Sequence, residues 1–209
     1  KARIFRPAGS VAAFSGNAGA RPTVSTRLSF LQTTALATYT TIDWAGIGDD
    51  VGLFSAYRVS RMQLAPSFAH PSSLVESSAM GSVAVPRPTY QPKLPPMVLA
   101  GGLSDAQMET VVYAGQAHSE ILPGFWALNE QKTSYTAVPE THEGGFQLRK
   151  GFFLGDGTGV GKGRQISAVI ADNVANGRPK AVWISKNDEL REDARRDWSA
   201  IGGAAKDLV

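Results

Sequence analysis

Residues 151–164 read Gly151-Phe-Phe-Leu-Gly-Asp-Gly-Thr-Gly-Val-Gly-Lys-Gly-Arg164 and indicate how this part of the chain folds. A short apolar run, 152–154, predicts a strand. Four alternate positions, 155 to 161, are glycine, and Lys162 follows them. Ile166, Val169 and Ile170 then recur at helical spacing and are expected on one face of an amphipathic helix. The order strand, glycine-rich turn, lysine and helix is typical of a phosphate-binding loop.

Such a loop binds anions because glycines let the backbone approach them, while N–H groups and the helix N-terminus supply partial positive charge. The pattern departs from G-x-x-x-x-G-K-[ST], since Asp156 stands at the first glycine position and Gly163 at the Ser/Thr position. A helicase-like form, with an early acidic residue and G-x-G-K at its end, fits residues 156–162 better. A loop that binds nothing is the alternative.

Composition and charge place few limits on function. The 209 residues carry a net charge of +3, which permits contact with nucleic acid without arguing for it. Cysteine is absent, so disulfides and thiolate metal sites are excluded. The histidines show no metal-ligand spacing, and no metal site is expected. No run is long and apolar enough to suggest a membrane partner. The start at Lys1 suggests a processed product or a piece of a longer protein.

Three segments follow from composition. Residues 1–52 are expected to be an arm or linker, and the dense prolines of 53–102 predict an irregular strap of extended segments and turns. Residues 103–209 are expected to hold the α/β unit. Its first helix would start with Ser104 as N-cap and Gln107 completing a capping box. The Gln107 amide could serve only this cap, or it could read an adenine edge, and both readings stay open.

The rest of the chain predicts a hairpin, a strand and a helix. The hairpin is expected around Trp126 and Phe146 within a long connection, 122–149. Residues 181–185 read as a buried strand, and 190–201 as a helix with Trp198 facing a sheet. Asp172, on the helix after the loop, is expected to face solvent. Together, residues 151–203 predict two units of a parallel α/β sheet.

Three stretches resemble the strawberry notch family, which is similar to superfamily 2 DExH helicases. They are Leu103-Ser-Asp-Ala-Gln-Met-Glu-Thr-Val-Val-Tyr-Ala-Gly-Gln-Ala-His118, the loop 151–164, and Ala181-Val-Trp-Ile-Ser-Lys-Asn-Asp-Glu-Leu-Arg-Glu-Asp-Ala-Arg-Arg-Asp197. The resemblance covers roughly residues 53–209. It implies that glycine after the loop lysine is a trait of the family rather than a defect of this chain.

The resemblance also implies ATP with Mg²⁺ in a partial RecA-like domain that works on DNA or RNA. Lys162 would be the catalytic residue, and Ser185 and Lys186 would touch the nucleic-acid backbone. A second RecA-like lobe and the acidic box that binds magnesium would lie elsewhere in a larger polypeptide, and the resemblance extends to members that carry a methylase. The expected nucleotide-binding residues are Gln107, Asp156, Gly157, Thr158, Gly159, Val160, Gly161, Lys162, Gly163 and Arg164.

Three functional hypotheses follow. The first is the ATP-binding portion of a nucleic-acid translocase, which alone would hold phosphates but hydrolyse ATP poorly. The second is an ordered structural segment of a large bacterial or phage methylase–helicase, of the antirestriction type, whose loop is unused in a virion. The third is a small P-loop kinase, although no substrate lid is apparent. The first two place the protein in the bacterial cytoplasm or in a phage particle.

Overall fold

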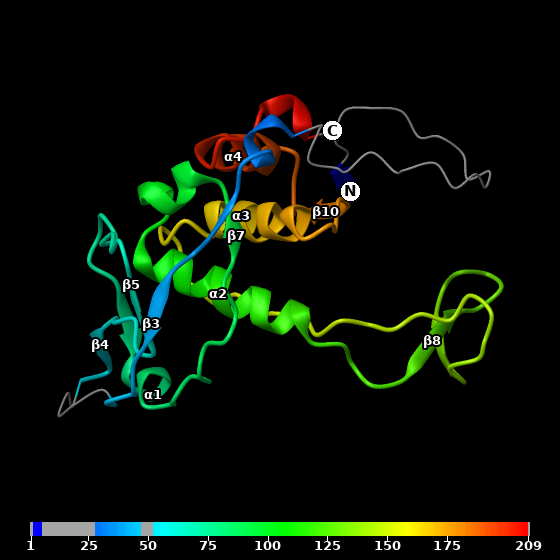
Figure 1. Ribbon diagram of the computed structural model, residues 1–209, viewed down its shortest axis with the longest axis horizontal. Coiled ribbons are helices and arrows are strands. Elements are labelled where there is room, and N and C mark those ends of the chain that lie inside the picture. The colour runs from blue at the N-terminus through cyan, green and yellow to red at the C-terminus, as the bar shows by residue number, and fades with distance from the viewer. Residues whose placement is uncertain (1, 6–27, 47–51, 209) are drawn as a thin grey trace.

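Three stacked helices form the centre of the molecule. The computed structural model describes residues 2–5, 28–46 and 52–208. Helix α2 (Asp105–Ser119) packs on α3 (Lys162–Ala175), and α3 packs on α4 (Leu190–Ala200), so that α3 is the middle layer (Figure 1). No helix in the described ranges is both long and apolar enough to cross a bilayer.

Small side chains in α3 allow this close stacking. Ala168 and Ala171 are fully buried in one apolar cluster with Val111 of α2 and Trp198 of α4. Trp198 also meets the ring of Phe30 edge-on, at a centroid distance of 5.1 Å. Most of the fully buried positions of α3 are therefore small or polar, while Val174 joins the cluster and Val169 and Ile170 pack against it partly buried. Ile166, predicted on one face with Val169 and Ile170, is 36% exposed, whereas those two pack against the cluster.

The described strands form only antiparallel pairs, and the expected parallel sheet is absent from them. Residues 151–157 form no strand, because no neighbouring strand pairs with them and Phe153 is 90% exposed. The five two-stranded ladders are β1 (Ala2–Phe5) with β10 (Ala181–Ile184), β2 (Ala35–Leu36) with β7 (Lys93–Leu94), β3 (Tyr39–Thr41) with β5 (Met62–Leu64), β4 (Phe54–Ala56) with β6 (Val75–Ser77), and β8 (Phe125–Leu128) with β9 (Tyr135–Val138). The fold is α/β in the broad sense of mixed helices and strands.

Short turns connect these elements. Helix α1 (Ser78–Gly81) starts at Ser77, whose side chain accepts a hydrogen bond from the Met80 N–H. The remaining short pieces are the 3₁₀ helices η2 (Ser29–Leu31) and η4 (Ala205–Asp207) and the π-type turn η3 (Val98–Gly102). Residues 53–102 thus contain short strands and turns with no long helix, as their prolines predict.

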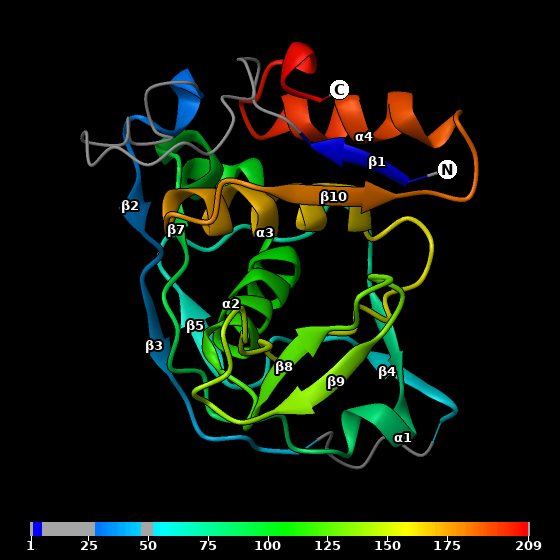
Figure 2. The same cartoon turned by 90° about the vertical axis from the view of Figure 1, so that its right-hand side faces the viewer.

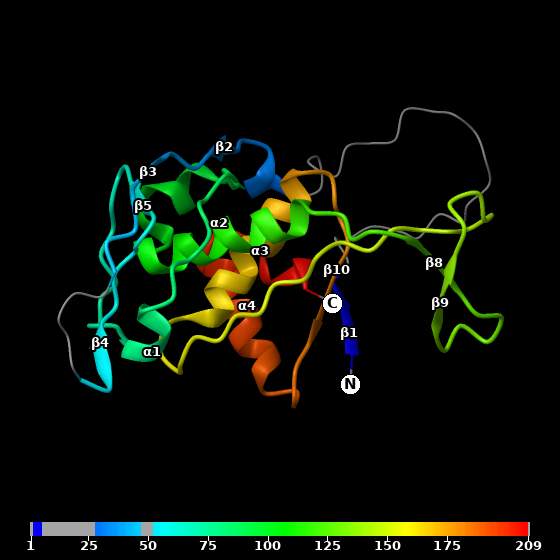
Figure 3. The same cartoon turned by 90° about the horizontal axis from the view of Figure 1, so that it is seen from below.

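The hairpin β8–β9 stands apart from the three helices (Figures 1 and 3). Phe146 bridges Trp126 in an antiparallel pairing, which confirms the hairpin that the sequence predicts there. The chain leaves and returns side by side, since Ile121 pairs with Arg149. The arm is thus closed at its base, and the chain re-enters the helical layer just before the glycine-rich loop.

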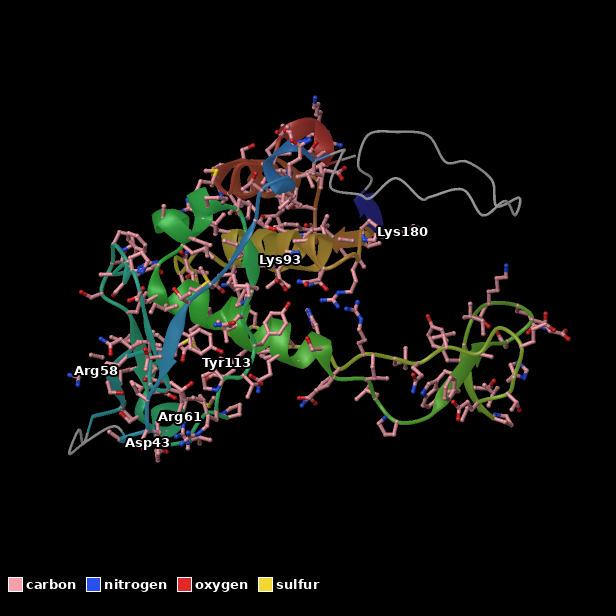
Figure 4. The ribbon with its side chains drawn as sticks, viewed as in Figure 1. Asp43, Arg58, Arg61, Lys93, Tyr113 and Lys180 are labelled. Carbon is pink, nitrogen blue, oxygen red and sulfur yellow. The ribbon has the colours of Figure 1, made fainter. Side chains whose placement is uncertain are left out.

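Asp172 is buried, and its predicted position on the solvent side of α3 is wrong. Its carboxylate is 1% exposed and accepts hydrogen bonds from the Tyr90 hydroxyl (2.7 Å), the Lys93 N–H (2.7 Å) and the Asn176 amide (3.0 Å). Lys93 is labelled in Figure 4 where β7 passes over α3. The sequence gives no sign of this because all but one of these donors come from a segment about 80 residues away.

A second buried carboxylate joins the strap to α2. Glu109 is 5% exposed and accepts a hydrogen bond from the Tyr57 hydroxyl. Burial raises the pKa of Glu109 to about 7, although the bond from Tyr57 opposes the shift. Tyr90 passes equally close, because a Cβ on Gly115 would overlap its ring. Segment 53–102 is therefore fixed to α2 by contacts that leave no room for larger side chains.

We expect Asp172→Ala to lower the free energy of unfolding by about 3 kcal/mol, because three donors lose their buried acceptor. Urea denaturation measures this change. Asp43→Ala is the control: Asp43 is 89% exposed and pairs with exposed Arg87, so its loss should cost less than about 1 kcal/mol. Equal losses in the two variants would contradict the role of Asp172.

Because its pKa is raised, Glu109 should make the folded state less stable as pH rises. Its pKa is about 7 in the folded chain against 4.5 for an unperturbed glutamate. The folded state binds the extra proton, so this stabilisation is complete below pH 4.5 and is lost as pH rises through 7. As pH rises from 4.5 to above 7, the free energy of unfolding of Glu109→Gln should increase by about 3 kcal/mol relative to that of the wild type. Urea denaturation measures this difference. The same change at exposed Glu140 is the control, and a pH-independent difference would contradict the assignment.

Candidate functional site: the glycine-rich loop at the start of helix α3

The loop turns into α3 through two glycines in left-handed backbone conformation. Gly159 has φ +91° and Gly161, the N-cap of α3, has φ +83°. Side chains strain such a backbone, so glycine is favoured at both positions. The turn places the first N–H groups of α3 beside the loop, where they and the helix dipole favour an anion. The helix predicted to follow the glycine-rich turn is confirmed, and it begins at Lys162.

The Lys162 ammonium group closes the loop from inside. Its Nζ donates to the carbonyl oxygens of Asp156 (2.8 Å) and Gly157 (2.7 Å). These two carbonyls lie at the beginning of the turn, so the lysine spans it from its far end. The cation is therefore already placed in the space that the loop encircles, where it can exchange carbonyl oxygens for phosphate oxygens.

Gln165 anchors the other side of the loop. Its Nε2 donates to the Asp156 carboxylate at 2.9 Å, and its side chain is fully buried. Its Oε1 has no hydrogen-bond partner among the described residues. Asp156, the early acidic residue of the helicase-like pattern, is thus fixed to the first turn of α3. One buried oxygen stays open beside it, and such orphaned acceptors often mark functional sites.

Gln107 connects α2 to the loop. Its Oε1 accepts from the Ser104 N–H at 3.0 Å, which confirms the predicted capping box, and its Nε2 donates to the Val160 carbonyl at 2.8 Å. The amide nitrogen carries a second N–H, so holding Val160 does not exhaust its donors. The cap reading is therefore correct, and recognition of adenine by the same amide stays a prediction.

A cleft of about 380 Å³ opens on the outer side of the loop. Five of the predicted nucleotide-binding residues line it: Gln107, Gly159, Val160, Gly161 and Arg164. Thr158 lies exposed at the turn, while Asp156, Gly157 and Lys162 bond to one another beneath it. The opposite wall comes from residues 68–72 and 101–104. The structure thus places half of the predicted set on this cleft, while Asp156, Gly157, Thr158, Lys162 and Gly163 do not line it.

Asp197 of α4 also lines this cleft and was not among the predicted site residues. Burial raises the pKa of its carboxyl, and Arg196 and Arg164 oppose that shift. Gly163 faces it across the interface of α3 and α4, with a Cβ position 2.9 Å from the Asp197 Cγ. The only signal in the sequence is the place of Asp197 directly before Trp198, which anchors α4 in the core.

Ser185 and Lys186 do not line the cleft. They follow β10, whose end points toward the same end of α3 as the loop (Figures 2 and 3). Lys186 is exposed and Ser185 half-buried. Their predicted contact with nucleic acid would therefore be made beside the nucleotide cleft rather than inside it.

The donor set fits Mg²⁺ only in part. Mg²⁺ prefers oxygen ligands and in nucleotide sites takes one or two carboxylates, phosphates and waters. The described residues contain no group of three or more metal-binding side chains, so no all-protein cage exists there. The cleft does present the Asp197 carboxylate next to the loop. This supply suits a cation that arrives with phosphates.

Three glycine variants separate backbone strain from steric overlap. A Cβ on Gly161 would lie 2.5 Å from the Gln107 Nε2, whereas nothing lies within 4 Å of such a Cβ on Gly159 or Gly157. We expect Gly157→Ala to be nearly neutral. Gly159→Ala should lower the free energy of unfolding by about 1–2 kcal/mol, because a side chain strains the positive φ at this position. Gly161→Ala should lose more and also expose the loop amides. Urea denaturation and amide hydrogen exchange measure both effects, and equal losses at 159 and 161 would contradict the Gln107 contact.

The chain resembles known proteins over the segment that carries this site. Residues 69–209 match the P-loop containing NTP hydrolase pore-1 family. Protein FORGETTER 1 of Arabidopsis thaliana is 38% identical over 150 residues, which are 71% of this chain and 10% of that protein. Protein strawberry notch of Drosophila melanogaster is 39% identical over 134 residues, 64% of this chain and 7% of that protein.

Protein strawberry notch homolog 2 of Homo sapiens is 38% identical over 128 residues, which are 61% of this chain and 8% of that protein. The chain thus spans a tenth or less of the length of these relatives. No solved structure matches it. The match over residues 69–209 includes the loop, Gln107 and α4, so the chain belongs to the P-loop containing NTP hydrolase pore-1 family, within the strawberry notch proteins.

Proposed function

We propose that the loop binds the phosphates of ATP, together with Mg²⁺, as the nucleotide-binding part of a helicase-like translocase. The observation that carries this proposal is the turn through Gly159 and Gly161 into the N-terminus of α3, with the Lys162 ammonium group inside it. The N-terminus of α3, with its N–H groups and dipole, lies beside the cleft, and the Lys162 cation is bonded to the loop carbonyls beneath it. That combination favours a polyphosphate over a neutral ligand.

Each side chain has a distinct task in this proposal. Lys162 exchanges the carbonyl oxygens of Asp156 and Gly157 for phosphate oxygens, which are stronger partners because they are charged. Gln107 keeps the loop in place through Val160 and offers its second N–H to a base. Arg164, half-buried on the first turn of α3, adds positive charge at the cleft. Bound Mg²⁺ supplies neutralisation of phosphate charge.

The coupling of this site to DNA or RNA is a further part of the proposal. The segment Ser185–Lys186 provides an exposed cation and a hydroxyl beside the nucleotide cleft, and both groups suit the phosphate backbone of a nucleic acid. Their place at the end of β10 and before α4 allows contact with a polymer that passes along this side of the molecule (Figure 2).

The larger setting stays a set of predictions. A second RecA-like lobe in the same polypeptide would complete the site around the terminal phosphate. An attached methylase, packaging in a virion, and a location in the bacterial cytoplasm or a phage particle stay at the same level. The segment shared with this chain is 10% of protein FORGETTER 1 and 7% of protein strawberry notch, which leaves room for additional domains in those relatives.

We expect Lys162→Ala to weaken ATP binding at least about tenfold, or 1.4 kcal/mol, because the loop loses its only enclosed cation. Titration with a fluorescent ATP analogue measures the affinity, and phosphate release with and without DNA or RNA measures turnover. Lys180→Ala is the matched control, since Lys180 is exposed near the opposite end of α3 (Figure 4). If both variants bind ATP as the wild type does, the loop is not the nucleotide site.

A further inference from the structure

The first turn of α3 lacks a hydroxyl at the position where P-loop proteins use one for magnesium. Gly163 directly follows the loop lysine, where the pattern G-x-x-x-x-G-K-[ST] places Ser or Thr. The structure gives a reason for this glycine. A Cβ at 163 would overlap the Asp197 Oδ2 and lie 2.9 Å from the Asp197 Cγ. The carboxylate of Asp197 therefore fills the volume that a Ser or Thr side chain would occupy.

Asp197 is held at this point by the packing of α4. The next residue, Trp198, is fully buried, and Ala194, one turn earlier, is 6% exposed against the core. The Asp197 side chain itself is 17% exposed and borders the nucleotide cleft beside Gly161. It therefore has a fixed backbone, a defined direction and access to the cleft, which a surface carboxylate would lack.

The charges around Asp197 leave it available to a cation. Arg196, on the same helix, places a guanidinium nitrogen 3.7 Å from the carboxylate, but its side chain is 69% exposed, so that solvent screens the pair. Arg164 of α3 contributes favourable charge and Asp193 of α4 unfavourable charge. Because the pair with Arg196 is screened and the carboxylate borders the cleft, Asp197 can take a further cation from that side.

We propose that Asp197 replaces the missing hydroxyl and binds the Mg²⁺ that accompanies the nucleotide. This inference rests on the proposed nucleotide site and assigns its metal ligand to another helix. A carboxylate differs from a hydroxyl in one decisive way, because it is charged. With Mg²⁺ present it attracts the metal–phosphate unit, and without Mg²⁺ it repels the bare phosphates. The affinity for nucleotide should therefore increase more on addition of Mg²⁺ than it would if the metal ligand were a neutral hydroxyl.

A purely structural role makes a different prediction. A carboxylate near the N-terminus of α3 also stabilises the helix dipole. In that case removal of its charge would lower stability without changing the effect of Mg²⁺ on nucleotide affinity. The ratio of affinities with and without the metal distinguishes the two roles, and that ratio does not depend on turnover.

The test is titration of a fluorescent ATP analogue into the wild type and Asp197→Asn, in Mg²⁺ and in EDTA. We expect Mg²⁺ to tighten binding to the wild type, and Asp197→Asn to reduce that gain roughly tenfold while binding in EDTA stays equal or improves. Asp193→Asn is the control, one turn earlier on α4 and half-exposed. An unchanged Mg²⁺ gain in Asp197→Asn overturns the inference. Failure of the wild type to bind at all overturns the proposed nucleotide site instead.

A swap of side chains tests the position itself. Gly163→Ser alone should destabilise the protein, because its Cβ overlaps the carboxylate. In Gly163→Ser/Asp197→Ala the new hydroxyl enters the freed volume, because the Cβ of residue 163 then meets only the Cβ of residue 197, at 3.4 Å. We expect this double variant to recover part of the Mg²⁺-dependent increase in nucleotide affinity that Asp197→Ala loses. A double variant that keeps a wild-type circular dichroism spectrum and yet shows no regain argues that residue 197 does not occupy the metal position.

Discussion

Two glycines in the first turn of α3 let two other helices touch its backbone, and the site depends on that constraint. A side chain at Gly161 would push away Gln107 of α2, and one at Gly163 would push away Asp197 of α4. Glycine at these positions is thus required by neighbours as well as by backbone conformation. The loop is held between α2 and α4 by direct contact with its backbone, and its groups are positioned before any ligand arrives.

The far end of α3 is fixed by a different kind of interaction. Asp172 collects donors from Tyr90, Lys93 and Asn176, while Ala168 and Ala171 fill the middle of the helix. A buried carboxylate is costly unless its bonds are satisfied, so this end tolerates little displacement. Since α3 is fixed at one end by charge and at the other by close backbone approach, it can present its N-terminus in a constant orientation.

Local signals predicted the elements of this site, and long-range contacts escaped them. The capping box of Ser104 and Gln107, the start of α3 at Lys162 and the burial of Trp198 each follow from residues close in sequence. The role of buried Asp172 depends on partners 79 and 82 residues away, and the role of partly buried Asp197 depends on the neighbouring helix α3. The expected strand at 152–154 failed for a related reason, since a strand forms only with a partner beside it.

The assignment of Asp197 changes how metal and nucleic acid could be connected. A hydroxyl on α3 would move with the phosphate loop, whereas a carboxylate on α4 depends on how α4 lies against α3. Helix α4 begins at Leu190, separated by three residues from the segment Ser185–Lys186, and the Asn187 side chain accepts a hydrogen bond from the Leu190 N–H at its start. One short helix thus joins the proposed nucleic-acid contact to the proposed metal ligand. A displacement of α4 by a bound polymer would shift the carboxylate relative to the phosphates, so that occupancy of one site biases the other.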